Sequence, residues 1–166
     1  PGLVELRQFY GSLAEGVFHS TQYVRHPSQP LYTPEPDIIH EVIGHGNMLG
    51  SPRFAALKHA AGEATLRVET EAALQAIADV FWFTMEFGVM YEDGELRAYG
   101  AGILSSYGEI EEFRGMEIRP IDIAETLPAS LATARQEAQE LRTAYRAACM
   151  PTDEAQAAGV ATVSDR

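Results

Sequence analysis

A lone carboxylate, Glu86, interrupts the otherwise almost entirely apolar segment of residues 80–90. On its N-terminal side, apolar side chains recur at helical spacing, at Ala73, Leu74, Ile77, Ala78, Phe81, Trp82 and Met85. This periodicity predicts one long helix over residues 69–91, with Glu86 on or beside the buried face. An ionised carboxylate in apolar surroundings needs a cation, several hydrogen bonds or a metal ion. Burial alone leaves a core pair with Arg or Lys as good an interpretation as a metal ligand.

Two histidines, His40 and His45, lie five residues apart in the segment HEVIGH. Five residues turn through about 140° on an ideal α-helix, so a regular helix would not direct both imidazoles at one point. The zinc-hydrolase spacing is four residues, and the spacing here differs from it. A local π-bulge or a helix that ends at His45 would bring the two rings together, and Gly44 and Gly46 permit either. The capping residues and prolines of segment 33–37 predict the start of this helix.

Together, His40, His45 and Glu86 form a set of two imidazoles and one carboxylate. Non-haem Fe(II) oxygenases use this set to occupy one face of an octahedron, with the other positions open. The same donor atoms also suit zinc or manganese. The residues therefore indicate a class of metal site, and the identity of the metal stays open at this point.

Four segments, residues 21–26, 31–41, 81–88 and 98–109, closely resemble the pterin-dependent aromatic amino acid hydroxylases in sequence and in order. The resemblance extends over about residues 2–113 and continues weakly to residue 148. It implies that iron is held by His40, His45 and Glu86, which would form the catalytic centre. The chain is shorter than the catalytic domains of this family, so we expect a truncated core without their N-terminal portion.

The resemblance also implies the residues that bind the substrate: Arg25, Thr33, Pro36, Asp37, Trp82, Gly102 and Ser105. Arg25 would bind the substrate carboxylate, because a guanidinium can donate two parallel hydrogen bonds. Asp37 would hold that guanidinium or the substrate amino group, although it could equally be a helix cap. Trp82 would line the pocket for the aromatic ring. Ser105 would in addition orient one ligand imidazole, with turn formation as its alternative role.

For the pterin cofactor, the resemblance implies contacts from Val4, Phe9, His19, Glu41, Ala78 and Phe81. Phe9 can offer a ring face for offset stacking. Phe81 stands where the family usually has a tyrosine, so the ring is kept and the hydroxyl is lost.

The implied activity is a non-haem iron(II) monooxygenase that hydroxylates the ring of an aromatic amino acid with O2 and a tetrahydropterin. Phenylalanine is the first expectation as substrate, with tyrosine and tryptophan as the others. Two alternatives stay open. The chain could be a truncated relative that acts on a different aromatic substrate in specialised metabolism, with or without pterin, or a non-catalytic metal-binding scaffold. Zinc hydrolysis is opposed by the histidine spacing.

Composition excludes several other classes. The formal net charge of −12 opposes binding to nucleic acid, and the single cysteine, Cys149, excludes an intrachain disulfide. We find no signal peptide and no membrane span, so we expect a cytoplasmic protein that does not bind membranes. The expected partners are small molecules, with a second copy of the chain or another chain covering the open pocket.

The expected fold class is mainly α, a single helical catalytic domain with a short β-hairpin, like that of the aromatic amino acid hydroxylases. Residues 1–150 would form the core and residues 151–166 a flexible tail. Further helices are predicted over residues 4–19, with Phe9, Leu13 and Val17 inward, and from Ser51–Pro52 onward. Another is predicted over residues 130–148, with Leu131, Ala134, Ala138, Leu141 and Tyr145 on its apolar face. Residues 92–94 are predicted to form a turn next to short extended segments.

Overall fold

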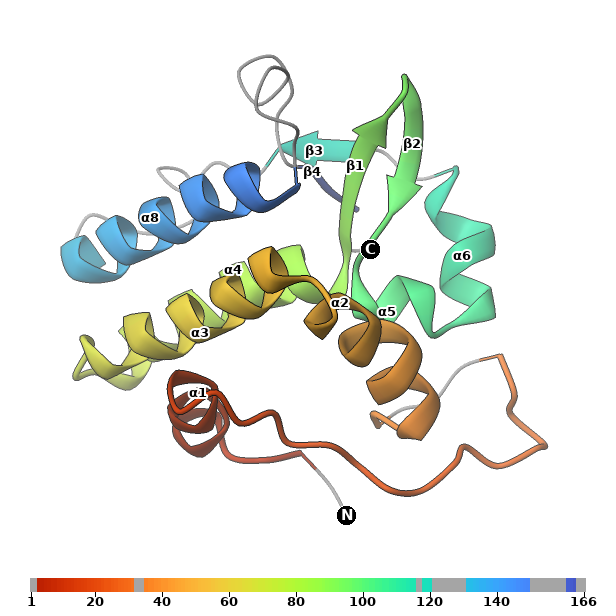
Figure 1. The fold of residues 1–166 in the computed structure, drawn as a ribbon, viewed down its shortest axis with the longest axis horizontal. Coiled ribbons are helices and arrows are strands. Elements are labelled where there is room, and N and C mark those ends of the chain that lie inside the picture. Colours follow the sequence, from red (N-terminus) through yellow and green to blue (C-terminus); the bar gives the residue numbers. More distant parts are fainter. Residues whose placement is uncertain (1–2, 32–34, 116–117, 121–130, 150–160, 164–166) are drawn as a thin grey trace.

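In the computed structural model, residues 3–31, 35–115, 118–120, 131–149 and 161–163 are described (Figure 1). The α-helices are α1 (Leu6–Ala14), α2 (Asn47–Leu49), α3 (Pro52–Leu66), α4 (Glu71–Phe81), α5 (Ala101–Leu104), α6 (Tyr107–Phe113) and α8 (Ala132–Cys149). Two π-helical segments are η1 (His40–Gly46) and η2 (Trp82–Glu86). The strands are β1 (Gly88–Glu92), β2 (Glu95–Ala98), β3 (Ile118–Pro120) and β4 (Ala161–Val163). The mainly helical fold class is confirmed.

The main core lies between helices. Helix α1 packs on α3, and α8 packs on both α3 and α4 (Figure 1). Ala134, Ala138 and Leu141 are buried, as the predicted apolar face of the last helix requires, and Leu131 packs against the same cluster. The side chain of Tyr145 lies outside the described residues. Within the part of the chain that is described, no helix has both the length and the hydropathy to cross a bilayer.

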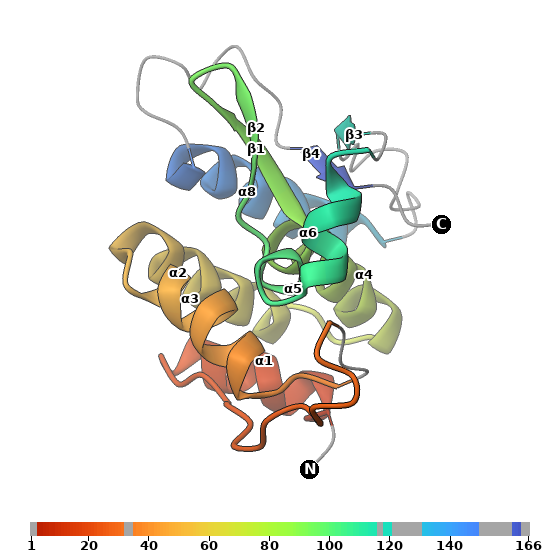
Figure 2. The ribbon, with the colours of Figure 1, turned by 90° about the vertical axis from the view of Figure 1, so that its right-hand side faces the viewer.

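The strands form a sheet in the order β2-β1-β4-β3, and the β1–β2 hairpin projects from one end of the helical body (Figures 1 and 2). Its turn contains Asp93 and Gly94 with φ of 52° and 77°. Positive φ at both central residues matches the right-handed twist of the flanking strands, which explains the Asp-Gly pair. The predicted turn is therefore confirmed. Strand β4 lies within the segment expected as a flexible tail, and the remaining residues of that tail lie outside the described ranges. The boundary at residue 150 stays a prediction.

Two predicted helices are too long. The first ends at Ala14, because Gly16 adopts a φ of 75° and closes the helix with bonds from Gly16 N to Leu13 O and from Val17 N to Ser12 O. Val17 is therefore 52% exposed and does not face inward.

The second overlong helix was predicted over residues 69–91. It begins after its cap, Thr70, becomes π-helical at Trp82 and ends at Glu86. Gly88 then begins β1, because pairing with β2 and β4 competes with continued helix. The chain thus changes from helix to strand directly after Glu86.

Candidate metal centre and substrate cavity

The two histidines lie on the π-helical segment η1, whose wider turn brings residues five apart near one another. This is the first of the two arrangements that the spacing left open. Gly44 lies against the start of α5, where a Cβ would come 2.7 Å from the Cβ of Ala101. Absence of a side chain at Gly44 therefore lets η1 pack closely on α5.

Glu86 ends the second π-helical segment, η2. The Thr84 hydroxyl donates to the carbonyl of Val80 at 2.6 Å, a back-bond that occurs where helices bend. Gly100 approaches the backbone of Glu86 so closely that any Cβ there would collide with it. The strand-to-helix connection after β2 thus holds the Glu86 backbone in place.

Three polar side chains converge between η1 and η2. His45 Nε2 lies 3.0 Å from His40 Nε2 and 3.0 Å from Glu86 Oε1, and His40 Nε2 lies 3.5 Å from Glu86 Oε2. Neighbouring ligands on an octahedral face, with bonds of about 2.1 Å at right angles, lie about 3.0 Å apart. The three residues therefore fit a divalent metal ion, and all three line the same cavity.

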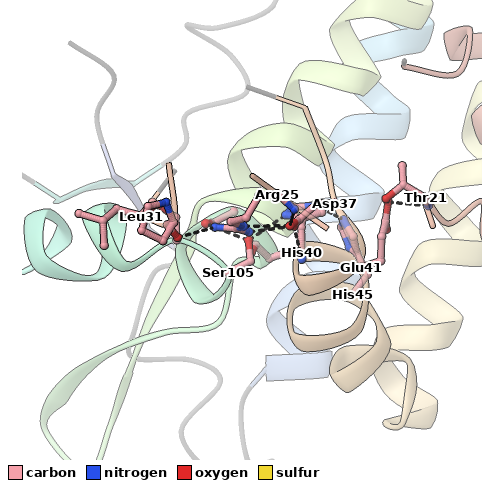
Figure 3. A network of polar contacts seen from close by, with 12 residues as sticks. Thr21, Arg25, Leu31, Asp37, His40, Glu41, His45 and Ser105 are labelled. Atoms are coloured by element: carbon pink, nitrogen blue, oxygen red, sulfur yellow. Dashed lines mark hydrogen bonds and ion pairs between the residues drawn. The ribbon is translucent and has the colours of Figure 1, made fainter. Parts of the chain in front are cut away.

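A second carboxylate, that of Glu41, also lies near the two histidines, with the ligand atoms of the three residues within 4.8 Å of one another. Glu41 Oε1 accepts hydrogen bonds from the backbone N of Thr21 at 3.2 Å and from its hydroxyl at 3.3 Å (Figure 3). Glu86 makes the shorter contacts to the imidazoles, so of the two carboxylates it is the better candidate for the third ligand. Glu41 stands on the cavity wall beside it.

Ser105 determines which nitrogen of His40 carries its proton. Its hydroxyl donates to the carbonyl of Ala101 at 2.7 Å and lies 2.9 Å from His40 Nδ1 (Figure 3). Since the hydroxyl has one hydrogen, it must accept from Nδ1–H. The lone pair of His40 is then on Nε2, the atom that faces Glu86 and His45.

Burial and neighbouring charges favour the protonation states of His40 and Glu86 that bind metal ions. Burial lowers the pKa of His40, against the opposing charge of Glu86, so the imidazole is neutral at neutral pH. Burial acts to raise the pKa of Glu86, but the hydrogen bond from His45 and the neighbouring charges lower it overall. An ionised carboxylate and a neutral imidazole are the forms that bind metal ions.

Arg25 and Asp37 form a buried ion pair beside η1. Arg25 Nε and Nη2 donate to the two Asp37 oxygens at 2.9 and 2.8 Å, and Arg25 N adds a bond of 2.8 Å. Asp37 also accepts from the backbone N of His40 at 3.0 Å. Asp37 thus holds the guanidinium and caps the helix at once, and it has no acceptor site left for a substrate amino group.

A cavity of about 1220 Å³ is lined in part by His40, His45 and Glu86. Fourteen of the predicted site residues line it: Val4, Phe9, His19, Arg25, Pro36, His40, Glu41, His45, Ala78, Phe81, Trp82, Glu86, Gly102 and Ser105. Asp37 lies behind Arg25 and does not line the cavity. Thr33 lies outside the described residues. The structure therefore brings most of the predicted site into one space.

Aromatic rings form two parts of the cavity wall. Phe9 makes edge-to-face contacts with Tyr10 at 5.2 Å and Phe81 at 6.1 Å between ring centroids. Trp82, on the other part, packs against Phe87 at 5.2 Å and is 51% exposed. Such walls suit flat, ring-shaped ligands.

Tyr10, which the sequence analysis did not single out, lines the cavity next to Phe81. Burial, reinforced by the charges of Glu86 and Asp79, raises the pKa of its hydroxyl, so it stays protonated. Its place on an amphipathic helix one residue after Phe9 was a weak signal for a wall residue.

Lys58 was also missed. It is buried on α3, and its Nζ lies 2.8 Å from His45 Nδ1. Burial lowers its pKa to about 8. The sequence does contain a signal, because Lys58 stands among Phe54, Leu57 and Ala61 at helical spacing. A charged residue on an inward helix face needs a partner.

The chain is similar in sequence to one known family of enzymes. The sequence profile of the biopterin-dependent aromatic amino acid hydroxylases matches residues 1–148. A phenylalanine 3-hydroxylase from Streptomyces coeruleorubidus is 57% identical over 123 residues, which cover 74% of this chain. The chain spans 44% of the length of that relative.

Solved structures of phenylalanine hydroxylases are similar to this chain in fold. The phenylalanine hydroxylase of Chromobacterium violaceum, with bound iron(III) and oxidised cofactor 7,8-dihydrobiopterin, superposes with a TM-score of 0.62 and 38% identity, over 66% of this chain and 40% of that one. The cold-active phenylalanine hydroxylase of Colwellia psychrerythraea gives a TM-score of 0.70 and 28% identity, over 89% and 65% of the two chains.

Proposed function

Because the chain belongs to the biopterin-dependent aromatic amino acid hydroxylases, we propose that it hydroxylates the ring of a free aromatic amino acid. The cofactors proposed are iron(II) at His40, His45 and Glu86 and a tetrahydropterin, with O2 as the oxidant. The observation that carries the proposal is the convergence of three side chains, with polar atoms 3.0 to 3.5 Å apart, on a cavity with a buried guanidinium and aromatic walls.

The choice of iron rests on the donor set and on the solved relative with bound iron(III). When bound, iron with the pterin supplies the activation of O2, which amino acid side chains cannot provide. The protein residues hold and orient the reactants. His40 presents Nε2 because Ser105 accepts its other ring proton, and Glu86 supplies the charge that a cation needs.

Arg25 is proposed to bind the substrate carboxylate. Asp37 fixes the guanidinium through Nε and one Nη2 hydrogen, which leaves Nη1 and the second Nη2 hydrogen directed elsewhere. Nη1 has one weak contact, with the Pro30 carbonyl at 3.5 Å. Arg25 therefore keeps donors for a carboxylate while its orientation is held from behind.

Pro36, Trp82 and Gly102 are proposed to enclose the aromatic ring of the substrate, and Thr33 is proposed to join them. Phe9, Ala78 and Phe81, with Val4, His19 and Glu41, are proposed to contact the pterin. The cavity of about 1220 Å³ exceeds the usual range of about 300 to 1,000 Å³ for one ligand. Its size supports a site for two small molecules.

Phenylalanine is the proposed substrate, and position 3 of its ring is the proposed position of hydroxylation. The support is the name of the 57% identical relative, a phenylalanine 3-hydroxylase. The test is anaerobic loading with iron(II), followed by addition of O2, a tetrahydropterin and each aromatic amino acid in turn. Chromatography against 2-, 3- and 4-hydroxyphenylalanine standards identifies the product.

The same assay separates the alternatives. Turnover of another aromatic compound, with no hydroxylated amino acid, would favour a relative with a different substrate. Turnover without pterin would exclude the pterin site as proposed. Iron binding with no turnover of any substrate would favour a metal-binding scaffold and would contradict the proposed activity. The variant Glu86→Gln, which removes the ligand charge but keeps its shape, is the matched negative control.

A further inference from the structure

Lys58 lies directly behind one of the two ligand histidines. It projects from α3, is 2% exposed and does not line the cavity, whereas His45 does. Its Nζ lies 2.8 Å from His45 Nδ1, which is a hydrogen-bonding distance. Lys58 therefore contacts the side of the imidazole that points away from Glu86, and it cannot touch a substrate in the cavity.

The His45 ring has close neighbours in addition to Lys58, and they restrict its orientation. The Phe18 ring lies 4.8 Å from the His45 ring between centroids, and the His40 ring lies 4.7 Å from it. Lys58 Nζ in turn lies 4.5 Å from the centre of the Phe18 ring. Phe18, which lines the cavity, and the buried Lys58 thus pack together against His45.

Each of the two ligand histidines has a polar partner at Nδ1, and the two partners differ in chemistry. His40 Nδ1 meets the hydroxyl of Ser105 at 2.9 Å, and His45 Nδ1 meets the amine of Lys58 at 2.8 Å. A metal at Nε2 leaves the ring proton on Nδ1, where the hydroxyl of Ser105 accepts it from His40 and the neutral amine of Lys58 accepts it from His45. A divalent cation bound to His45 favours that neutral form, because it repels an ammonium group. Partners at this position fix the direction of a ligand imidazole and raise its basicity.

We propose that Lys58 is a positioning residue of the metal centre. It holds the His45 ring so that Nε2 faces Glu86 and His40, and it acts through His45 without touching the metal or the substrate. The inference rests on the proposed function only in requiring that His40, His45 and Glu86 bind a divalent metal ion.

The experiment measures Co(II) affinity by titration of the metal-free protein. Lys58→Met keeps an unbranched chain of similar length and removes the polar atom, so it should weaken Co(II) binding by about 10- to 100-fold. Lys58→Gln shortens the chain but keeps an oxygen that can accept from Nδ1–H, so it should weaken binding less. The control Leu57→Met repacks the next buried residue of α3 and should leave affinity unchanged.

A spectroscopic measurement identifies the histidine involved. Protons on the Nδ1 atoms of Co(II)-bound histidines give strongly shifted, solvent-exchangeable NMR signals. The wild-type protein should show one for each of His40 and His45. Lys58→Met should lose the His45 signal through fast exchange with water, and Ser105→Ala should lose the His40 signal. Thermal unfolding of each metal-free variant establishes that it is folded.

The outcomes are distinguishable. If wild-type protein binds Co(II) and Lys58→Met binds it equally well with both signals present, the inference about Lys58 is wrong and the proposed function stands. If Leu57→Met weakens binding as much as Lys58→Met, the effect is one of helix packing and the inference is wrong. If wild-type protein binds no divalent metal, the proposed function itself is wrong. The proposed role of Lys58 is then wrong as well, because it requires a metal at His45.

Discussion

Replacing Asp37 by Asn should lower the free energy of unfolding by about 3 to 5 kcal/mol, which is the usual cost of leaving one partner of a buried ion pair uncompensated. The Asp37 side chain is completely buried, and its carboxylate accepts from three N–H groups of Arg25 and from His40 N. An amide has the same shape but only one acceptor oxygen, and its NH2 group would face donors. Arg25 would remain charged and buried.

Urea denaturation at pH 7 measures the effect. With a slope of about 2 kcal/mol per M, a loss of about 4 kcal/mol moves the midpoint down by about 2 M. The control is Glu95→Gln, which removes an exposed pair of 2.6 Å with Arg97 and should cost less than about 1 kcal/mol. The double variant Arg25→Met/Asp37→Leu should be more stable than Asp37→Asn, because it removes both charges.

Acid provides an independent check on Asp37. Its hydrogen bond with the Arg25 guanidinium holds the pKa of the carboxyl well below its usual range. A depressed native-state pKa contributes stability above the unfolded-state value of about 3.9, and this contribution is lost as pH falls through the native-state pKa. The difference between wild type and Asp37→Asn should therefore shrink below about pH 4. A difference under about 1 kcal/mol at pH 7, or one unchanged in acid, would refute the reasoning.

Three further predictions concern the metal and the packing around it. Glu86→Gln should abolish the stabilisation that Co(II) gives the wild type, about 2.7 kcal/mol at 100 times the Kd, in calorimetric unfolding scans; a retained shift would contradict its role as ligand. Gly44→Ala should lower the urea midpoint through a loss of about 1 to 3 kcal/mol, because its Cβ would lie 2.7 Å from that of Ala101; an unchanged midpoint would mean that η1 and α5 separate freely. Arg67→Met should cost about 1 kcal/mol in the same urea assay by removing the 2.8 Å bonds to Glu137 of α8; no loss would mean that the pair does not hold α8.

Sequence reasoning succeeded where the determining interaction is local. The start of α3 follows from Ser51 and Pro52, and the hairpin turn follows from the Asp-Gly pair. The buried face of α8 follows from apolar spacing, which the structure confirms at Ala134 and Ala138. Each of these signals lies within a few residues of the feature that it determines.

The end of the helix after Glu86 could not be predicted in this way. The apolar run continues through Val89 and Met90, so helical periodicity gives no reason to stop. The change to strand depends on pairing with β2 and with β4, and β4 is more than 60 residues away in the sequence. Long-range pairing of this kind has no local signature.

The site residues show the same difference between local signals and long-range contacts. The three proposed metal ligands, His40, His45 and Glu86, could be identified from residue type, spacing and resemblance. The role of Asp37 stayed open between helix cap, partner of Arg25 and partner of the substrate amino group, and the structure shows the first two. Lys58 was missed because its contact with His45 joins two helical segments, and only the folded chain brings them together.

The π-helical segment between the two histidines makes the metal centre more sensitive to chain length than to side-chain identity. Val42 and Ile43, which lie between the histidines, are 59% and 51% exposed, so most substitutions there should be tolerated. Deleting either one would allow an ordinary α-helix and bring the histidines to a spacing of four, the arrangement of zinc hydrolases. Random substitution libraries would then show a permissive segment, whereas single-residue deletion libraries would show an intolerant one at the same positions.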